Sequence, residues 1–218
     1  YPVKDSDEFV EIATTRPETL LGDTAVAVHP EDERFKAYVG KNATVPLYEF
    51  EIPILTDEAV SMEKGTGAVM CATFGDAMDV EWYQRHKLTY KKIILSNGKI
   101  EDSVSYIGGM AIEKARERMI ELLRENNLLV KQETINHMIG IHERCGKGVE
   151  FIPSKQWYID VLTEKERYLK AADEIKWYPE HMKNRYTLWV ENLKWDWCIS
   201  RQRIFATPIP VWYCKDCG

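Results

Sequence analysis

The sequence contains no long hydrophobic run and no excess of basic residues, and these two absences exclude several classes of protein. Its apolar stretches are far shorter than the roughly 20 residues that a membrane-spanning helix needs. The N-terminal region also lacks the apolar core of a signal peptide. The formal net charge is −6, which argues against non-specific nucleic-acid binding as the main function but leaves room for a local basic patch. We therefore expect a cytoplasmic protein with no membrane partner.

Cysteine is also scarce, and its pattern is not that of a disulfide scaffold. The 218 residues include five cysteines, two of them in a Cys-x-x-Cys pair, which fits a reducing compartment. Hydrophobic residues make up 44% of the chain, enough to bury a core in one large domain or in one domain with an extension. The chain starts in the middle of a sequence pattern and ends at Gly218, one residue after the last cysteine. We therefore expect a piece of a longer cytosolic protein.

The most informative stretch is residues 13–30, ATTRPETLLGDTAVAVHP. Apolar patterning predicts short strands at residues 9–13 and 25–29, paired with each other. The connection between them gathers hydroxyl, guanidinium and carboxyl groups around a rigid proline, which suits a small polar ligand and its phosphodiester. An ordinary turn before a helix start explains the same residues about equally well. The polar side chains are Thr14, Thr15, Arg16, Glu18 and Thr19.

Two further patterns allow a structural or a functional interpretation. Gly65, Thr66 and Gly67 are typical of a tight turn before a buried strand, or of backbone that approaches a ligand closely. Asp76 and Asp79 are three residues apart, so they share one face of the first turn of a predicted helix. Acids at that position stabilise a helix N-terminus, and one of them is also placed to bind an ammonium group.

The remaining pattern predicts an α+β, mainly β fold. Predicted strands at residues 43–46, 50–55 and 68–72 and helices at 76–86 and 111–126 indicate a β-barrel with peripheral helices over residues 1–150. Residues 151–218 form a predicted helical connector with helices at 163–175 and 179–193. Five of the seven tryptophans lie in this connector between residues 157 and 197, a density that requires packing partners.

Three ordered blocks resemble one enzyme family. The first is TTRPET at 14–19 with GDTAVAVHP at 22–30, the second GTGAV at 65–69, and the third DWCISRQ at 196–202 with PIPVWYC at 208–214. Together they resemble the inserted editing domain of valyl-tRNA synthetases and its return into the catalytic body. Isoleucyl enzymes resemble the first block less closely, and leucyl enzymes lack its continuation. The resemblance covers nearly the whole chain, and it implies a β-barrel inserted into a nucleotide-binding catalytic domain.

The resemblance implies hydrolysis of the ester of threonyl-tRNA(Val), with threonyl-adenylate as a further candidate substrate. A pocket sized for valine cannot strongly reject the nearly isosteric threonine, so a second site must select the hydroxyl. The sequence shows no Ser or Cys nucleophile beside a base, so we expect attack by water without a cofactor. The partners implied are the 3′ end of tRNA(Val) carrying threonine and the remainder of the synthetase.

The resemblance also assigns roles to individual residues. It implies that Asp79 binds the α-ammonium of the aminoacyl group, with Asp76 in support. It places Arg16 and Thr19 in the pocket lining, and Thr14 and Thr15 beside the scissile ester and the terminal adenosine.

The chain departs from the bacterial pattern of this family. Met70 and Ala72 stand where many bacterial valyl enzymes have Lys and Thr, and the following TFGD looks like an archaeal-type subgroup. The hydroxyl-recognition role of those two side chains is therefore absent or moved, with Thr73 as a candidate. Two alternatives follow: a module that binds the tRNA acceptor end without hydrolysis, and an editing domain of the isoleucyl type.

Two short motifs have the spacing of zinc ligands. His142 and Cys145 form one half-knuckle, and Cys214 and Cys217 form another, so four ligands would complete one tetrahedral site if the halves met. The family pattern instead pairs each half with cysteines elsewhere in the full enzyme. A structural zinc-bearing connector is thus a third alternative.

Overall fold

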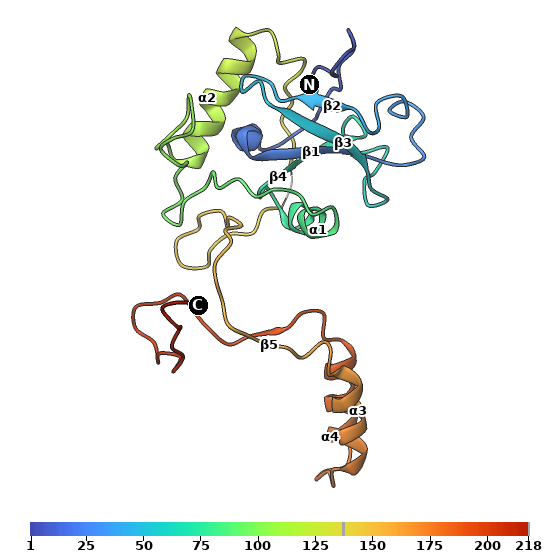
Figure 1. The fold of residues 1–218 in the computed structure, drawn as a ribbon, viewed down its shortest axis with the longest axis vertical. Coiled ribbons are helices and arrows are strands. Elements are labelled where there is room, and N and C mark those ends of the chain that lie inside the picture. The colour runs from blue at the N-terminus through green and yellow to red at the C-terminus, as the bar shows by residue number, and fades with distance from the viewer. Residues whose placement is uncertain (137, 218) are drawn as a thin grey trace. The chain divides into compact units, whose positions relative to one another are not determined.

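The computed structural model describes residues 1–136 and 138–217 of the chain. These residues fall into two compact units, unit 1 over Tyr1–Ile152 and unit 2 over Pro153–Gly218. Unit 1 contains the sheet and two helices (Figure 1). The assignment of residues 1–150 to editing and of 151–218 to a connector stays a prediction.

A four-stranded mixed sheet forms the centre of unit 1. Its strands are β1 (Asp23–Val28), β2 (Asn42–Thr44), β3 (Glu51–Thr56) and β4 (Ala68–Ala72), in the order β2-β3-β1-β4. β1 runs parallel to β3 and antiparallel to β4. All six residues of β1 are buried, which explains its continuous run of small and branched side chains, since both faces of a central strand pack against other elements.

The sheet confirms the α+β prediction and corrects its details. The predicted strand at 9–13 is wrong: Phe9 makes only an isolated bridge to Pro2, so residues 9–13 do not pair with β1 as predicted. The predicted closed barrel is not seen among the described residues, where β2 and β4 are the two edges of an open sheet. Four strands are too few to close around a packed interior, which takes about eight.

Two helices flank this sheet and both were predicted. α1 (Ala77–Arg85) follows β4 directly, and α2 (Ile112–Glu125) covers the core with Ala115, Met119 and Leu122 buried on one face. That spacing of four and three residues is the helical repeat. A 3-10 helix, η1 (Pro17–Gly22), contacts α2 and leads into β1.

Unit 2 consists of two short strands and two helices. β5 (Tyr158–Ile159) pairs antiparallel with β6 (Trp197–Cys198), and α3 (Lys165–Glu174) packs on α4 (Met182–Glu191). The two helices lie within the predicted ranges. Trp189, Trp195 and Trp197 are each more than half exposed. Among the helices of the described residues, none has the length and hydropathy to cross a membrane.

Candidate functional site

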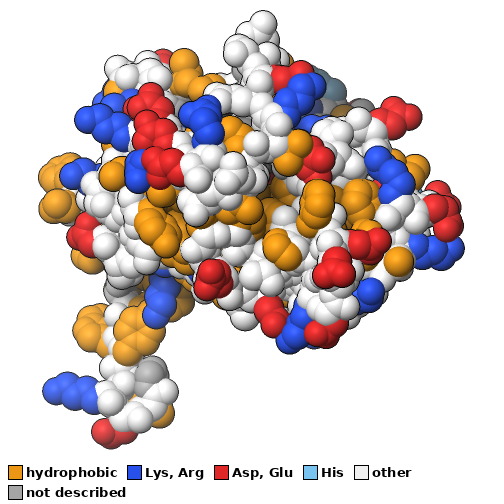
Figure 2. Space-filling view, turned by 90° about the horizontal axis from the view of Figure 1, so that it is seen from above, with side chains coloured by type: hydrophobic (Ala, Val, Ile, Leu, Met, Phe, Trp, Pro, Cys, Tyr) orange, Lys and Arg blue, Asp and Glu red, His pale blue; other side chains and the backbone are white. Residues whose placement is uncertain are grey.

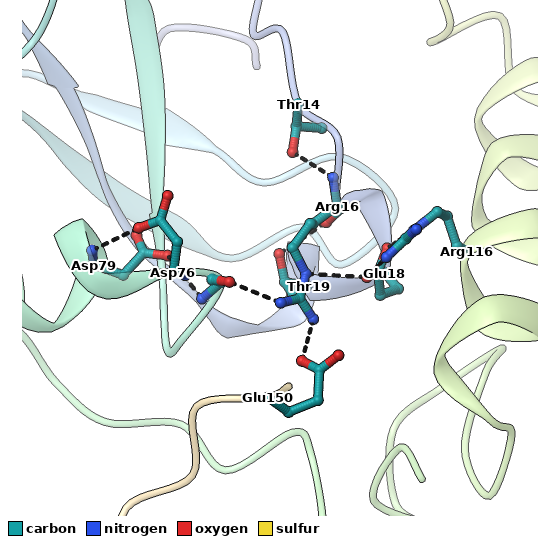
Figure 3. A network of polar contacts seen from close by, with 9 residues as sticks. Thr14, Arg16, Glu18, Thr19, Asp76, Asp79, Arg116 and Glu150 are labelled. Carbon is teal, nitrogen blue, oxygen red and sulfur yellow. Dashed lines mark hydrogen bonds and ion pairs between the residues drawn. The ribbon is translucent and has the colours of Figure 1, made fainter. Parts of the chain in front are cut away.

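Residues 14–19, which we call the polar loop, lie before and within η1 and place Arg16 at the centre of a network of polar contacts (Figure 3). Arg16 precedes η1, where Pro17 stands at the first helical position, as its fixed φ favours. Its side chain donates from Nη1 to the carbonyl oxygen of Gly75 (2.7 Å) and from Nη2 to Oε2 of Glu150 (2.5 Å). Both terminal nitrogens of the guanidinium are therefore held by residues that lie far along the chain.

Asp79 lies on the first turn of α1 and accepts three backbone hydrogen bonds. Oδ1 accepts from the amide of Ala72 (3.1 Å), and Oδ2 accepts from Gly75 (2.7 Å) and Asp76 (3.1 Å). Asp76 caps the same helix, and the two acids form a capping box. A carboxylate has about four acceptor positions. Three of them are used here, which leaves one for a ligand.

Burial changes the acidity of Asp79. Its side chain is only 7% exposed, and desolvation, opposed by the hydrogen bonds from the Gly75, Asp76 and Ala72 amides, raises its pKa to about 6. A carboxyl group that titrates near 6 is mainly ionised at neutral pH. It is then able to bind a cation.

Gly75 joins Arg16 to Asp79. Its carbonyl oxygen accepts from Arg16, and its amide donates to Asp79, so a single residue links both charged groups. A Cβ atom at this position would lie 2.8 Å from Oδ2 of Asp79. Glycine is therefore required by the close approach of the carboxylate.

Glu18 is the buried anchor on the other side of Arg16. It is 1% exposed, and its carboxylate accepts from Nε of Arg16 (3.2 Å) and from Nε and Nη2 of Arg116 (3.0 and 2.8 Å). Arg116 comes from α2, and Glu150 completes the chain of charges. A buried carboxylate is tolerated only when paired in this way. The sequence places Glu18 in the polar loop but gives it no role of its own, and sequence reasoning did not select Gly75, Arg116 or Glu150 as site residues.

The predicted hydroxyl groups fall into exposed and buried sets. Thr14 and Thr15 are exposed, and Oγ1 of Thr14 accepts from the Arg16 amide (3.0 Å). Thr19 is fully buried and donates to the Arg16 carbonyl oxygen (2.8 Å), so it holds the loop together. Thr73 is 3% exposed and its hydroxyl bonds to backbone groups of Gly22 and Lys91.

The turn at Gly65, Thr66 and Gly67 lies beside the start of the polar loop. Both glycines have positive φ, +63° and +85°, a conformation that other residues rarely adopt. A Cβ at Gly65 would lie 2.9 Å from the Cβ of Ala13, which shows how closely this turn approaches the residue before Thr14. The turn thus adjoins the loop, but no hydrogen bond among the described residues ties it to Arg16 or Asp79.

Ala72 pairs across the sheet with Asp23, a third buried carboxyl group, and Met70 lies two residues earlier on β4. Asp23 is fully buried and bonds the hydroxyl of Tyr1, which also lies 3.7 Å from Sδ of Met70. Desolvation raises the pKa of Asp23 well above its usual value. Lys91 donates to the carbonyl oxygen of Asp23 (3.0 Å). In this chain, therefore, a tyrosine hydroxyl and an apolar thioether adjoin Asp23.

His142 and Cys145 of the zinc motifs lie in unit 1, and Cys214 and Cys217 lie in unit 2. Sγ of Cys145 lies 3.3 Å from Nδ1 of His142, a separation compatible with two ligands of one tetrahedral ion. Backbone amides of Asp216 and Cys217 lower the pKa of the Cys214 thiol, which favours the thiolate that a metal binds. No three metal-ligating side chains gather in the described part of the chain, so zinc stays a prediction.

Comparison with known proteins agrees with the three motif blocks. A family model for class I tRNA synthetases (I, L, M and V) matches residues 10–218. Valine–tRNA ligases of Archaeoglobus fulgidus and Methanocaldococcus jannaschii are each 49% identical, over 97% and 100% of this chain. The chain spans 24% and 25% of the length of these relatives.

Two solved structures that match cover little more than half of this chain, 57% and 56%. One is the ternary complex of the Agrobacterium radiobacter K84 LeuRS with tRNA and LeuAMS, which is 23% identical at a TM-score of 0.47. That match covers 57% of this chain and 18% of the other, a likeness too low to support a conclusion. The family match over almost the whole sequence is decisive: the chain belongs to the class I tRNA synthetases, and it is similar to about a quarter of a valine–tRNA ligase.

Proposed function

We propose that unit 1 is an editing site that hydrolyses the ester of threonyl-tRNA(Val), with threonyl-adenylate as a second substrate. The observation that carries this proposal is the Asp79 carboxylate, which is nearly buried, ionised at neutral pH and left with one acceptor position. An aminoacyl ester carries a positive ammonium group one carbon from the scissile bond. A fixed anion at this place binds that group and sets the position of the ester.

The remaining side chains supply orientation and polarity. Thr14 and Thr15 are exposed beside Arg16, so their hydroxyls are accessible to the ester and the terminal ribose. Arg16 is held by Gly75, Glu18 and Glu150, so its positive charge is fixed, and it is linked to Asp79 through Gly75. Fixed donors stabilise the negative charge that develops on an ester oxygen during attack.

The reaction needs only water as the second reactant. A water oxygen attacks the ester carbonyl carbon and forms a tetrahedral intermediate. The bond from that carbon to the ribose oxygen then breaks, and the ribose oxygen takes up a proton. The products are threonine and tRNA with a free terminal hydroxyl, and no cofactor takes part.

Two other functions compete with this proposal. A module that binds the acceptor end without hydrolysis would need the polar loop and the turn at Gly65, Thr66 and Gly67, but it would not need an ionised Asp79. An editing domain of the isoleucyl type would release valine, and the Arg16, Pro17 and Glu18 sequence disfavours it. Location in the cytoplasm remains part of the proposal.

Replacement of Asp79 by Asn tests the ammonium anchor. Because the variant removes the charge that pairs with the ammonium, we expect deacylation of threonyl-tRNA(Val) to slow by about 30-fold or more. Glu81→Gln removes the same charge from the exposed face of α1 and is expected to act as wild type. Release of threonine and of valine from the two charged tRNAs is measured in the full-length enzyme. Equal rates for Asp79→Asn and wild type would refute the anchor.

The pKa of Asp79 predicts the pH dependence. The carboxyl group is neutral below about pH 6 and ionised above it, so deacylation should rise as pH increases from 5 to 7, while the substrate ammonium stays charged. The same raised pKa stabilises the folded state below pH 3.8, and this stabilisation is lost as pH rises through 6. The rise in rate therefore does not come from improved folding. After subtraction of uncatalysed hydrolysis, Asp79→Asn should show no such step.

Gly75→Ala tests the link between Arg16 and Asp79. Since the added Cβ would lie 2.8 Å from Oδ2 of Asp79, the carboxylate must shift, and we expect deacylation to slow by up to about 100-fold, the cost of a misplacement of about 1 Å. Gly140→Ala is a control, because nothing lies within 4 Å of a Cβ there and its φ is not positive. Both variants are compared by deacylation rate and by thermal unfolding. Full activity in Gly75→Ala would show that the position of Asp79 is not critical.

We also propose that the two half-knuckles hold zinc. Metal analysis of the purified full-length enzyme should show bound zinc, and Cys145→Ser and Cys214→Ser should each lower the zinc content. If one ion is shared, either variant alone removes it. If each half pairs with other cysteines, each variant removes only part. Unchanged zinc content in both variants would refute the proposal.

A further inference from the structure

Unit 1 has an open groove outside the Arg16 and Asp79 network, with a volume of about 410 Å³. We call it the aromatic groove. Aromatic and polar side chains share its walls: Phe9, Glu11, Arg34, Phe35, Tyr38 and Thr66.

The apolar part of the groove consists of aromatic rings. Phe9 is 67% exposed, although exposure of a phenylalanine ring to water is unfavourable. Phe35 forms a buried part of the wall, and the Arg34 guanidinium carbon lies 5.2 Å from the centre of its ring. Tyr38 is half-buried. The groove therefore offers flat π surfaces to a ligand.

The polar part of the groove has unused hydrogen-bonding groups. Arg34 is fixed by Asp32, with Nε to Oδ1 at 2.9 Å and Nη2 to Oδ2 at 2.6 Å, and Nη2 also donates to the Met62 carbonyl oxygen. Within the described residues, Nη1 of Arg34 and the carboxylate of Glu11 have no hydrogen-bond partner. The groove thus combines a positioned donor, a charged acceptor and aromatic faces.

We propose that the aromatic groove binds an unpaired nucleobase of the RNA strand whose 3′ end enters the editing site. Bases of single strands stack on aromatic side chains and are read by hydrogen bonds to their edges. Arg34 donates to a ring nitrogen or carbonyl oxygen, and Glu11 accepts from an exocyclic amino group, as carboxylates do from cytosine N4. Cytosine and adenine carry that amino group and uracil does not, so the groove favours the first two.

The aromatic groove adjoins the polar loop. Thr66 belongs to the turn whose Gly65 closely approaches Ala13, and Glu11 lies three residues before Thr14. A base in the groove would thus belong to a nucleotide close to the terminal one. Figure 2 shows acidic and basic side chains interspersed over one face of the molecule rather than gathered in a basic patch. The net charge of −6 likewise disfavours broad phosphate contact, so stacking is the more favourable source of affinity. This inference rests on the proposed function.

The test measures RNA affinity and requires no catalysis. The full-length enzyme is titrated with an uncharged RNA hairpin that has a single-stranded 3′ ACCA end, and with matched hairpins that end in AUUA or are blunt. Phe9→Leu, which keeps apolar area but removes the ring, should weaken binding of the ACCA hairpin by about 5- to 150-fold. Phe9→Tyr should bind as wild type does.

Two further pairs of measurements isolate the stacking and the edge contacts. Tyr38→Leu should weaken binding while Tyr38→Phe preserves it. Glu11→Gln should reduce the preference for the ACCA over the AUUA hairpin. Tyr106→Leu is the control, since Tyr106 is an aromatic residue 55% exposed outside the groove, and it should leave affinity unchanged.

The outcomes separate this inference from the proposed function. Wild-type affinity of Phe9→Leu, or equal binding of ACCA and blunt hairpins by wild type, would overturn the groove assignment even if threonyl-tRNA(Val) is hydrolysed. Binding that depends on Phe9 in an enzyme without deacylation would retain the groove and refute the editing function. A Phe9→Leu variant with reduced thermal stability and unchanged RNA affinity would overturn the assignment and leave Phe9 with a structural role only.

Discussion

The candidate site depends on one buried negative charge, the Glu18 carboxylate, which has no exposed side-chain surface. Such a group is stable inside a protein only if opposite charges and donors surround it. Arg116 and Arg16 supply them, so Glu18 joins helix α2 to the polar loop and orients the Arg16 side chain. Because Arg16 in turn holds Gly75, the position of Asp79 follows from the same buried charge.

Local patterns in the sequence predicted the regular elements well. Strands β1 and β4 and helices α1 and α2 have strong periodicity or composition, and each was predicted within a few residues. The pairing of strands was harder, because β1 takes β3 as its parallel neighbour across a long connection, and no local signal specifies that choice. For the same reason the open sheet was predicted as a barrel, and residues 9–13 were assigned to a hairpin.

The residues of the candidate site divide in the same way. Arg16 and Asp79 stand in recognisable motifs and are selected from the sequence, and their roles stay predictions. Their partners could not be found, because Arg116 is 98 residues from Glu18 and Glu150 is 134 residues from Arg16. An arginine on the polar side of a helix looks like any solvated charge. Thr19 shows the opposite difficulty. The sequence predicts a hydroxyl that lines the ligand pocket, but in the structure Thr19 is buried and its hydroxyl donates to the Arg16 carbonyl oxygen.

The peptide groups around Gly75 have a consequence for how a bound ligand would be sensed. Asp79, the peptide group between Gly75 and Asp76, Arg16 and Glu150 form three hydrogen bonds in series, and bonds in such a chain polarise one another. Neutralisation of Asp79 by a cation would therefore alter the strength with which Arg16 holds Glu150. Glu150 lies two residues before the end of unit 1. A cation bound at Asp79 would thus change the electrostatic surroundings of the last residues of unit 1.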